Sequence, residues 1–157
     1  MVLTEGEIGY IAGLIDGEGH ISVGRRYHYD GRERKHPYYL VIVALTSTHL
    51  GVLEWVEQRC GGKIYKKSNG TPDGKNKPHW QLVFMGNRTI RRFLEPLVPY
   101  LIIKADQARI ALEFLAIPRY TRDSVLREEY YLLMQSLNAR GVKERKEQQN
   151  AFQAVSP

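Results

Sequence analysis

Residues 11–19, IAGLIDGEG, decide the fold of this chain because they join a glycine-spaced apolar helix to two acids. Small residues recur every fourth position along this helix, at Gly9, Gly13 and Gly17. Residues four apart share one helical face, so this face carries no side chains and lets a second backbone approach closely. Asp16 and Glu18 fall at the helix C-terminus, where the dipole is already negative and a bound cation would offset the repulsion. We interpret the segment as a close-packed helix pair that presents acids to a metal ion.

The flanking sequence predicts an α+β domain with the element order α-β-β-α-β-β-α-α-α. Thr4 and Glu7 form a capping box that begins the first helix, and alternation from residue 20 predicts a strand. Residues 27–36 are polar and read as a long hairpin loop. Further strands are predicted at 38–45, 63–67 and 79–85, and further helices at 49–60, 87–95, 104–117 and 124–138. Helices then cover one face of a four-stranded sheet and leave the other bare.

The length of 157 residues supports a single domain, which we place at 1–141, followed by a polar tail at 142–157 that we expect to be loosely ordered. The formal net charge of +6 suggests nucleic acid as the partner, although an ordinary basic protein has the same charge. Cys60 is the only cysteine, which excludes an intrachain disulfide and indicates a reducing compartment.

The sequence lacks several targeting signals and cofactor motifs, which narrows the classes of protein to consider. The N-terminus lacks a secretion signal and no apolar run is long enough for a membrane span, so we expect an intracellular protein with no membrane association. An organelle (chloroplast or mitochondrion) and a prokaryotic cytoplasm both remain open. Nothing resembles a P-loop, which argues against a nucleotide cofactor. The five histidines lack zinc-site spacing.

The nonapeptide resembles the LAGLIDADG motif, with Ile11, Gly17 and Glu18 replacing Leu, Ala and Asp of that motif. Residues 97–104, LVPYLIIK, and 137–141, LNARG, also resemble segments of the LAGLIDADG homing endonucleases. The resemblance implies the fold of that family, an αββαββα core with C-terminal helices and a saddle-shaped antiparallel sheet. It also implies a homodimer, because the chain carries one motif and two motif helices build one catalytic centre.

The activity implied by the resemblance is that of an intron-encoded, site-specific homing endonuclease. Such an enzyme makes a double-strand break with short 3′ overhangs in a long pseudo-palindromic double-stranded DNA target, by phosphodiester hydrolysis that depends on Mg²⁺. Mn²⁺ or Ca²⁺ would substitute, Ca²⁺ without cleavage. Two alternatives use the same fold: an RNA-binding maturase that assists group I intron splicing, and a DNA-binding regulator without catalytic activity.

Candidate active-site residues follow from the resemblance and from the chemistry of each group. Glu18 is the expected metal ligand, assisted by the main-chain carbonyl of Gly17, because Mg²⁺ prefers hard oxygen donors. Lys104 would orient the attacking water and stabilise developing charge. Thr46 is either a third polar catalytic residue, a position that can slip to Leu45 or Ser47, or only a helix cap. Asp16 is expected to have a structural role at the helix end. The expected dimer interface comprises Gly9, Ala12, Gly13, Asp16 and Gly17.

The bare sheet face is the expected DNA-reading surface, because a two-stranded ribbon fits the major groove. With Ile21 and Val23 inward, the outward residues would be Ser22, Gly24, Arg26 and His28, then Tyr38, Leu40 and Ile42, then Lys66 and Ser68, then His79, Gln81 and Val83. Phosphate contacts are expected from basic residues of the strands and hairpin loops, namely Arg25, Arg32, Arg34, Lys35, Lys67, Lys75 and Lys77.

Overall fold

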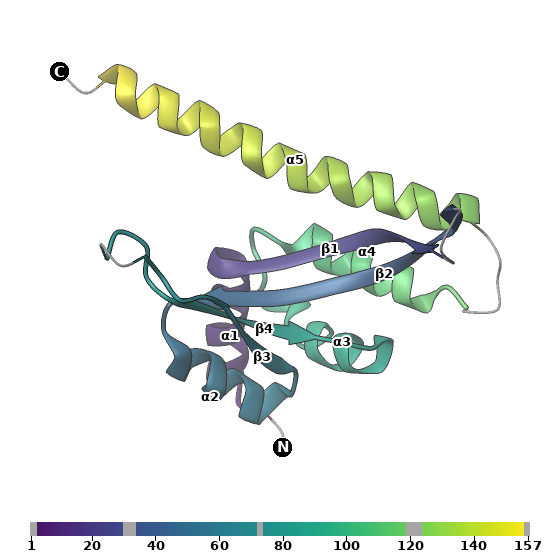
Figure 1. The fold of residues 1–157 in the computed structure, drawn as a ribbon, viewed down its shortest axis with the longest axis horizontal. Helices are drawn as coiled ribbons and strands as arrows, with labels where there is room; N and C mark the ends of the chain where they lie inside the picture. Colours follow the sequence, from purple (N-terminus) through teal and green to yellow (C-terminus); the bar gives the residue numbers. More distant parts are fainter. Residues whose placement is uncertain (1–2, 30–33, 72–73, 119–123, 156–157) are drawn as a thin grey trace.

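The computed structural model describes residues 3–29, 34–71, 74–118 and 124–155, and it confirms the α+β class (Figure 1). Side chains are described within these ranges except at 28–29, 34–36 and 140–155. The elements are α1 (Glu5–Glu18), β1 (Gly19–Tyr29), β2 (Arg34–Ser47), α2 (Leu50–Cys60), β3 (Lys63–Ser68), β4 (His79–Phe84), α3 (Asn87–Leu94), a 3₁₀ turn (Val98–Tyr100), α4 (Ala105–Ala116) and α5 (Ser124–Val155).

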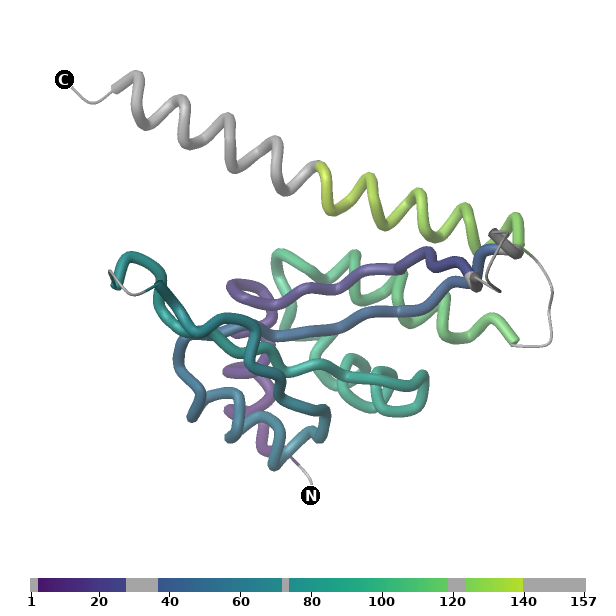
Figure 2. Tube along the Cα trace, viewed as in Figure 1, coloured from purple at the N-terminus to yellow at the C-terminus, as the bar shows by residue number. Residues whose placement is uncertain are grey.

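The four strands form one antiparallel sheet in the order β1-β2-β4-β3. Within β2, only the last part, from Val43 to Ser47, pairs with β4. The remainder of the β1–β2 pair, residues 22–29 and 34–42, therefore extends beyond the other strands as a two-stranded ribbon (Figure 1). Helix α5 runs beside β1, and its described side chains end at residue 139 (Figure 2).

Helices α1 to α4 bury one face of the sheet in a single core. Ile11 and Ile15 of α1 are 0% exposed. They belong to the same hydrophobic cluster as the inward residues of β1, β2 and β4. The rings of Phe84 and Phe93 stack with their centroids 3.8 Å apart, which joins β4 to α3. No helix in the described ranges has an apolar stretch long enough to cross a bilayer.

Most predicted boundaries lie within one residue of those in the structure, and the larger differences concern the β1–β2 hairpin, the end of β2 and the last helix. Residues 27–29 and 34–36 belong to strands rather than to a loop, because cross-strand pairs such as Tyr27↔Pro37 extend the ladder. Strand β2 also continues through Ser47, so Thr46 lies in a strand and not in a helix cap. The last helix ends at Val155 and not at Gly141, since residues 143–154 are mostly good helix formers. The loosely ordered tail that we expected is therefore helical, and the domain boundary at 141 stays a prediction.

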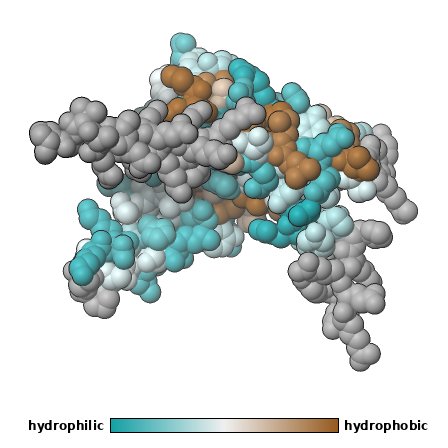
Figure 3. All heavy atoms as spheres, turned by 90° about the horizontal axis from the view of Figure 1, so that it is seen from above, coloured by the Kyte–Doolittle hydropathy of each residue, from teal (hydrophilic) through white to brown (hydrophobic). Residues whose placement is uncertain are grey.

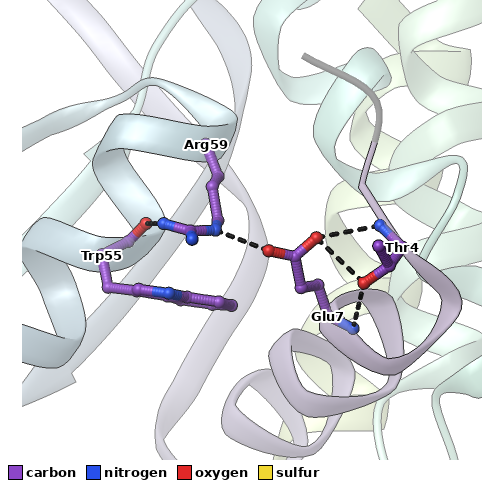
Figure 4. Close-up of polar contacts among 4 residues, drawn as sticks. All are labelled: Thr4, Glu7, Trp55 and Arg59. Carbon is purple, nitrogen blue, oxygen red and sulfur yellow. Dashed lines mark hydrogen bonds and ion pairs between the residues drawn. The ribbon is translucent and has the colours of Figure 1, made fainter.

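A polar network at the start of α1 joins it to α2 (Figure 4). Thr4 and Glu7 form the predicted capping box, with the Thr4 main-chain N–H donating to Glu7 over 2.9 Å. The other Glu7 oxygen accepts from Nε of Arg59 over 2.7 Å. Arg59 also donates to the main-chain oxygen of Trp55 and lies 4.1 Å from the centroid of its ring. One carboxylate thus caps α1 and pairs with α2.

Glu7→Gln should remove an acid-sensitive contribution to stability. Hydrogen bonds from Arg59 and Thr4 lower the pKa of Glu7 from 4.5 to about 2. A group whose pKa is lower in the folded state stabilises fully above its unfolded pKa, and this stabilisation is lost as the pH falls towards the folded pKa. The difference in the free energy of unfolding between wild type and Glu7→Gln, from urea titrations, should therefore shrink as the pH falls from about 4.5 to about 2.

The matched control is Glu54→Gln, at an exposed acid of α2 without an ion pair or hydrogen bond among the described residues. It should show no such pH dependence. A stability difference for Glu7→Gln that stays constant across this pH range would contradict the assignment.

Candidate metal centre and nucleic-acid interface

Asp16 joins the end of α1 to the start of α4. Its carboxylate accepts from the main-chain N–H of Ile102 over 2.7 Å and from that of Lys104 over 2.9 Å. In return, Nζ of Lys104 donates to the main-chain oxygen of Asp16. The last turn of α1 contains no basic residue of its own, so Lys104 supplies the cation that the helix dipole favours there. The structural role expected for Asp16 is the role that these contacts give it.

Glu18 is the last residue of α1 and is exposed, as is Gly17 before it. Strand β1 begins at once with Gly19, whose N–H donates to the Ile15 carbonyl and closes the helix. A Cβ at Gly19 would lie 2.5 Å from that carbonyl oxygen, so the direct step from helix to strand requires glycine. This step leaves Glu18 in solvent, two residues along the chain from the carbonyl held by Lys104.

The donors at this helix end suit a hard divalent cation, since a carboxylate and main-chain carbonyls are the oxygen ligands that Mg²⁺ prefers. The described residues contain no group of three or more His, Cys, Asp or Glu that would hold a metal ion. Glu18 and the Gly17 carbonyl therefore stay candidate ligands only. A complete Mg²⁺ site would need further oxygen donors, such as water, phosphate or a second chain.

The glycine face of α1 is open. A Cβ built at Gly9, Gly13 or Gly17 would meet no atom within 4 Å, and Gly13 and Gly17 are exposed. Ala12, which we expected on this face, is 0% exposed and belongs to the core. The reason is helical geometry: Ala12 lies three residues before the buried Ile15 and shares its face. Ala12 is therefore removed from the candidate dimer interface.

Thr46 faces Gln81 at the end of the sheet where β1 begins. The Gln81 amide donates to the Thr46 hydroxyl over 3.3 Å, and these residues are a cross-strand pair. Thr46 follows Leu45, the partner of Gly19, so it lies at the same end of the sheet as Glu18. Of the neighbouring alternatives, Leu45 is 1% exposed, and the Ser47 hydroxyl accepts from the His49 N–H. Thr46 therefore stays the candidate polar residue here.

His20 is a further candidate residue of the site, and the sequence analysis did not identify it. Its Nε2 lies 2.9 Å from the Ser22 hydroxyl, on the sheet face that the helices leave bare. Desolvation lowers the pKa of His20, and the positive charge of Lys104 lowers it further. The His20 ring therefore lies within the electrostatic influence of that lysine. The available signal was its parity, because His20 stands two residues after Glu18 and alternates in step with Ser22.

The outer face of the ribbon carries the residues expected there from β1 and β2. Cross-strand pairs on this face are Gly24↔Leu40 and Arg26↔Tyr38, while Val23 and Val41 point into the core. Tyr38 is 41% exposed and Leu40 36%. A Cβ at Gly24 would lie 2.8 Å from Cδ1 of Ile42, so glycine gives that side chain its place on the face. Farther across the sheet, the same face carries Gln81 and Val83, with His79 paired to Ser68.

Three expected DNA contacts need correction. Ser22 is on the outer face but is only 6% exposed, and its hydroxyl is engaged by His20. Lys66 pairs with Trp80 and shares the parity of the inward residues, whereas Tyr65, opposite Gln81, is on the outer face. Arg25 points to the helix side of the sheet and pairs with Glu128 of α5 at 2.6 Å. Lys67, Lys75 and Lys77 are exposed, and the expectations for His28, Arg32, Arg34 and Lys35 lie outside the described side chains.

Comparisons with known proteins agree with this geometry. A family model described as a LAGLIDADG-like domain matches residues 5–97. The chain is similar to the homing endonuclease I-CvuI in complex with an I-CreI target, with 24% identity, a TM-score of 0.62, and coverage of 86% of this chain and 82% of that chain. It is also similar to the archaeal intron-encoded homing endonuclease I-Vdi141I complexed with DNA, with 23% identity, a TM-score of 0.57, and coverage of 71% and 67%. The group I intron-encoded I-CeuI complexed with DNA shares 14% identity, with a TM-score of 0.54 and coverage of 73% and 56%. At these identities the likeness shows the fold, and no curated protein matches the chain in sequence.

Asp16→Asn should loosen the junction between α1 and α4. The Ile102 and Lys104 N–H groups donate to different oxygens of the Asp16 carboxylate, and in asparagine an NH₂ group, which cannot accept, replaces one of these oxygens. We expect the free energy of unfolding to fall by about 1–3 kcal/mol, and the amide hydrogens of these two residues to exchange faster. The control is Asp106→Asn, which breaks only an exposed pair with Arg109 and should cost less than about 1 kcal/mol. Equal effects of the two variants would contradict a special role for Asp16.

Proposed function

Because the chain belongs to the LAGLIDADG-like domain family, we propose that it is a site-specific homing endonuclease that makes a double-strand break in a long pseudo-palindromic DNA target. The observation that carries the proposal is the helix end where Glu18 is exposed, two residues after Asp16, which contacts Lys104 through both its carboxylate and its main-chain carbonyl. Helix α1 ends at Glu18 and strand β1 starts at Gly19, so this helix end adjoins the start of the sheet face that the helices leave bare, which we call the outer face. Acid, cation and DNA-reading surface therefore adjoin one another.

DNA would bind along the outer face of the sheet. A two-stranded ribbon fits the major groove, where each base pair shows its own pattern of donors and acceptors. Arg26 and Gln81 can hydrogen-bond to base edges, and Leu40 and Ile42 can contact thymine methyl groups. Lys67, Lys75 and Lys77 are exposed and basic, which suits phosphate contacts that give affinity without sequence information.

Phosphodiester hydrolysis would take place at the end of α1. Glu18 and the Gly17 carbonyl would hold Mg²⁺, which when bound supplies an activated water and neutralises charge on the leaving oxygen. Lys104 would orient the attacking water and stabilise the negative charge that develops on the phosphate. Asp16 holds Lys104 in place through the main chain, so the ammonium group needs little reorganisation during the reaction.

Two chains would complete one catalytic centre. Each chain carries a single motif helix, and its glycine face is open to close approach by another backbone. A twofold axis along this face would bring the two Glu18 carboxylates near each other, beside adjacent phosphates of the two DNA strands. Charge repulsion between them is the reason that cations are required, and the shared axis matches a pseudo-palindromic target.

Glu18→Gln should abolish cleavage while DNA binding remains. Loss of the carboxylate removes the main ligand of a cation that contributes several kcal/mol to transition-state stabilisation, so the single-turnover rate should fall by at least about 10²-fold. Phosphate and base contacts are untouched, so the Kd measured in Ca²⁺ should change by less than about threefold. Glu18→Asp, which restores the motif acid, should retain activity, and Glu54→Gln should match wild type.

Cleavage by Glu18→Gln at the wild-type rate would remove Glu18 from the metal site. DNA binding without cleavage by the wild-type chain would instead favour the regulator, and tight binding to intron RNA alone would favour the maturase.

Gly13→Leu should separate the dimer without unfolding the chain. A Cβ at this position meets nothing within 4 Å, and leucine has a higher helix propensity than glycine, so each chain alone accommodates it. The side chain would instead enter the space that a partner helix needs. We expect sedimentation to show monomers for Gly13→Leu, with helical circular dichroism intact. Ala116→Leu, at an exposed position of α4, controls for added apolar size. A Gly13→Leu chain with the dimer mass would contradict helix pairing through this face.

A further inference from the structure

Four side chains connect the β1–β2 ribbon to α5 on the side opposite the outer face. One oxygen of Glu128 accepts from Arg25 of β1 over 2.6 Å, and the other accepts from the hydroxyl of Tyr39 of β2. Arg25 and Tyr39 are direct cross-strand partners, so a single carboxylate of α5 bridges both strands. Tyr131, one helical turn after Glu128, lies under Arg25 at 4.7 Å and contacts the Tyr39 ring at 6.3 Å between centroids. We call these four residues the Glu128 cluster.

The ribbon needs such a support because of its position in the sheet. Strand β4 pairs with β2 only from Val43 onward, so Arg25 and Tyr39 lie where no third strand stabilises the pair. An isolated two-stranded pair is marginally stable at best in water. Helix α5 supplies the missing neighbour: Met134 is fully buried in the core, and Asn138 donates to the Ile21 carbonyl over 3.4 Å. The described part of α5 runs beside β1 (Figure 2), and apolar patches lie among hydrophilic regions on this side of the molecule (Figure 3).

Partial burial and several simultaneous contacts distinguish the Glu128 cluster from an exposed surface ion pair. The Arg25 and Glu128 side chains are 35% and 30% exposed, so water only partly screens their attraction. Both carboxylate oxygens have a donor, and the Arg25 guanidinium also stacks on Tyr131. Burial and the Glu128 carboxylate raise the pKa of Tyr39 to about 12, so its hydroxyl keeps the proton that it donates.

The outer face at the same level of the ribbon carries Gly24, Arg26, Tyr38 and Leu40, directly beside Arg25 and Tyr39 in the two strands. We propose that Glu128 is a positioning residue for DNA recognition: from behind the ribbon, it holds both strands at the angle at which these outer residues meet the bases. The proposal rests on the proposed DNA-binding function. It places the cluster about 20 Å from Glu18, since a strand rises about 3.3 Å per residue, so the chemistry should not depend on it.

The test compares Glu128→Ala with Glu129→Ala, a neighbouring exposed acid without an ion pair or hydrogen bond among the described residues. Three quantities are measured: amide hydrogen exchange at residues 24–27 and 38–40 in the free protein, the Kd for a cleavable DNA duplex in Ca²⁺, and the single-turnover rate at saturating DNA in Mg²⁺. Glu128→Ala should speed exchange in the ribbon, raise Kd by about tenfold, and leave the saturated rate within about twofold. Glu129→Ala should match wild type in all three.

Tyr39→Phe provides a milder second variant, because it removes only the hydroxyl and keeps the ring in place. It should change exchange and Kd in the same direction as Glu128→Ala, and it decides the matter if that variant does not fold. Unchanged ribbon exchange, an unchanged Kd, or equal effects of Glu128→Ala and Glu129→Ala would overturn the proposal. Absence of DNA binding by the wild-type chain would contradict the proposed function, whereas wild-type binding with an unaffected Glu128→Ala chain would contradict the positioning role alone.

Discussion

The carboxylate of Asp16 is the constraint on which the rest of the site depends. It accepts two main-chain N–H groups from the segment before α4, and the side chain of Lys104 returns to the last turn of α1. The negative C-terminal end of the helix dipole repels both acids there, Asp16 and Glu18. The contacts show that the two acids have different surroundings. Asp16 is used to join two helices, and Lys104 supplies part of the compensating positive charge. Glu18 is left exposed, and we propose it as the ligand of a further cation.

Adjacent residues of the ribbon fall on opposite faces of the sheet, one packed against the helices and the other bare. Arg25 and Arg26 are neighbours of the same type, yet Arg25 pairs with Glu128 behind the ribbon and Arg26 lies on the outer face. In our proposals, Arg25 helps to hold the ribbon and Arg26 is free to contact DNA. Net charge alone does not distinguish the two, because both contribute equally to it.

Local signals in the sequence predicted much of this arrangement. The capping box at Thr4, the glycine spacing of α1 and the alternation of β1 and β2 each depend on residues near in sequence, and each is present in the structure. Long-range contacts were not predictable in this way. The Arg25–Glu128 pair joins residues 103 apart, and the hydrogen bond from Asn138 to the Ile21 carbonyl joins residues 117 apart. Lys66 was misplaced because its strand is short and irregular, and one register shift changes the face that a residue occupies.

We have proposed that two copies of this chain form one metal-dependent nuclease with a twofold axis between their motif helices. The decisive experiment is selection of cut sites from a random duplex library in the presence of Mg²⁺. We expect both strands to be cut at one recurrent site, whose two halves are related by an approximate twofold axis centred on the break. Recovery of no specific double-strand break, or of a recurrent site without such symmetry, would contradict it.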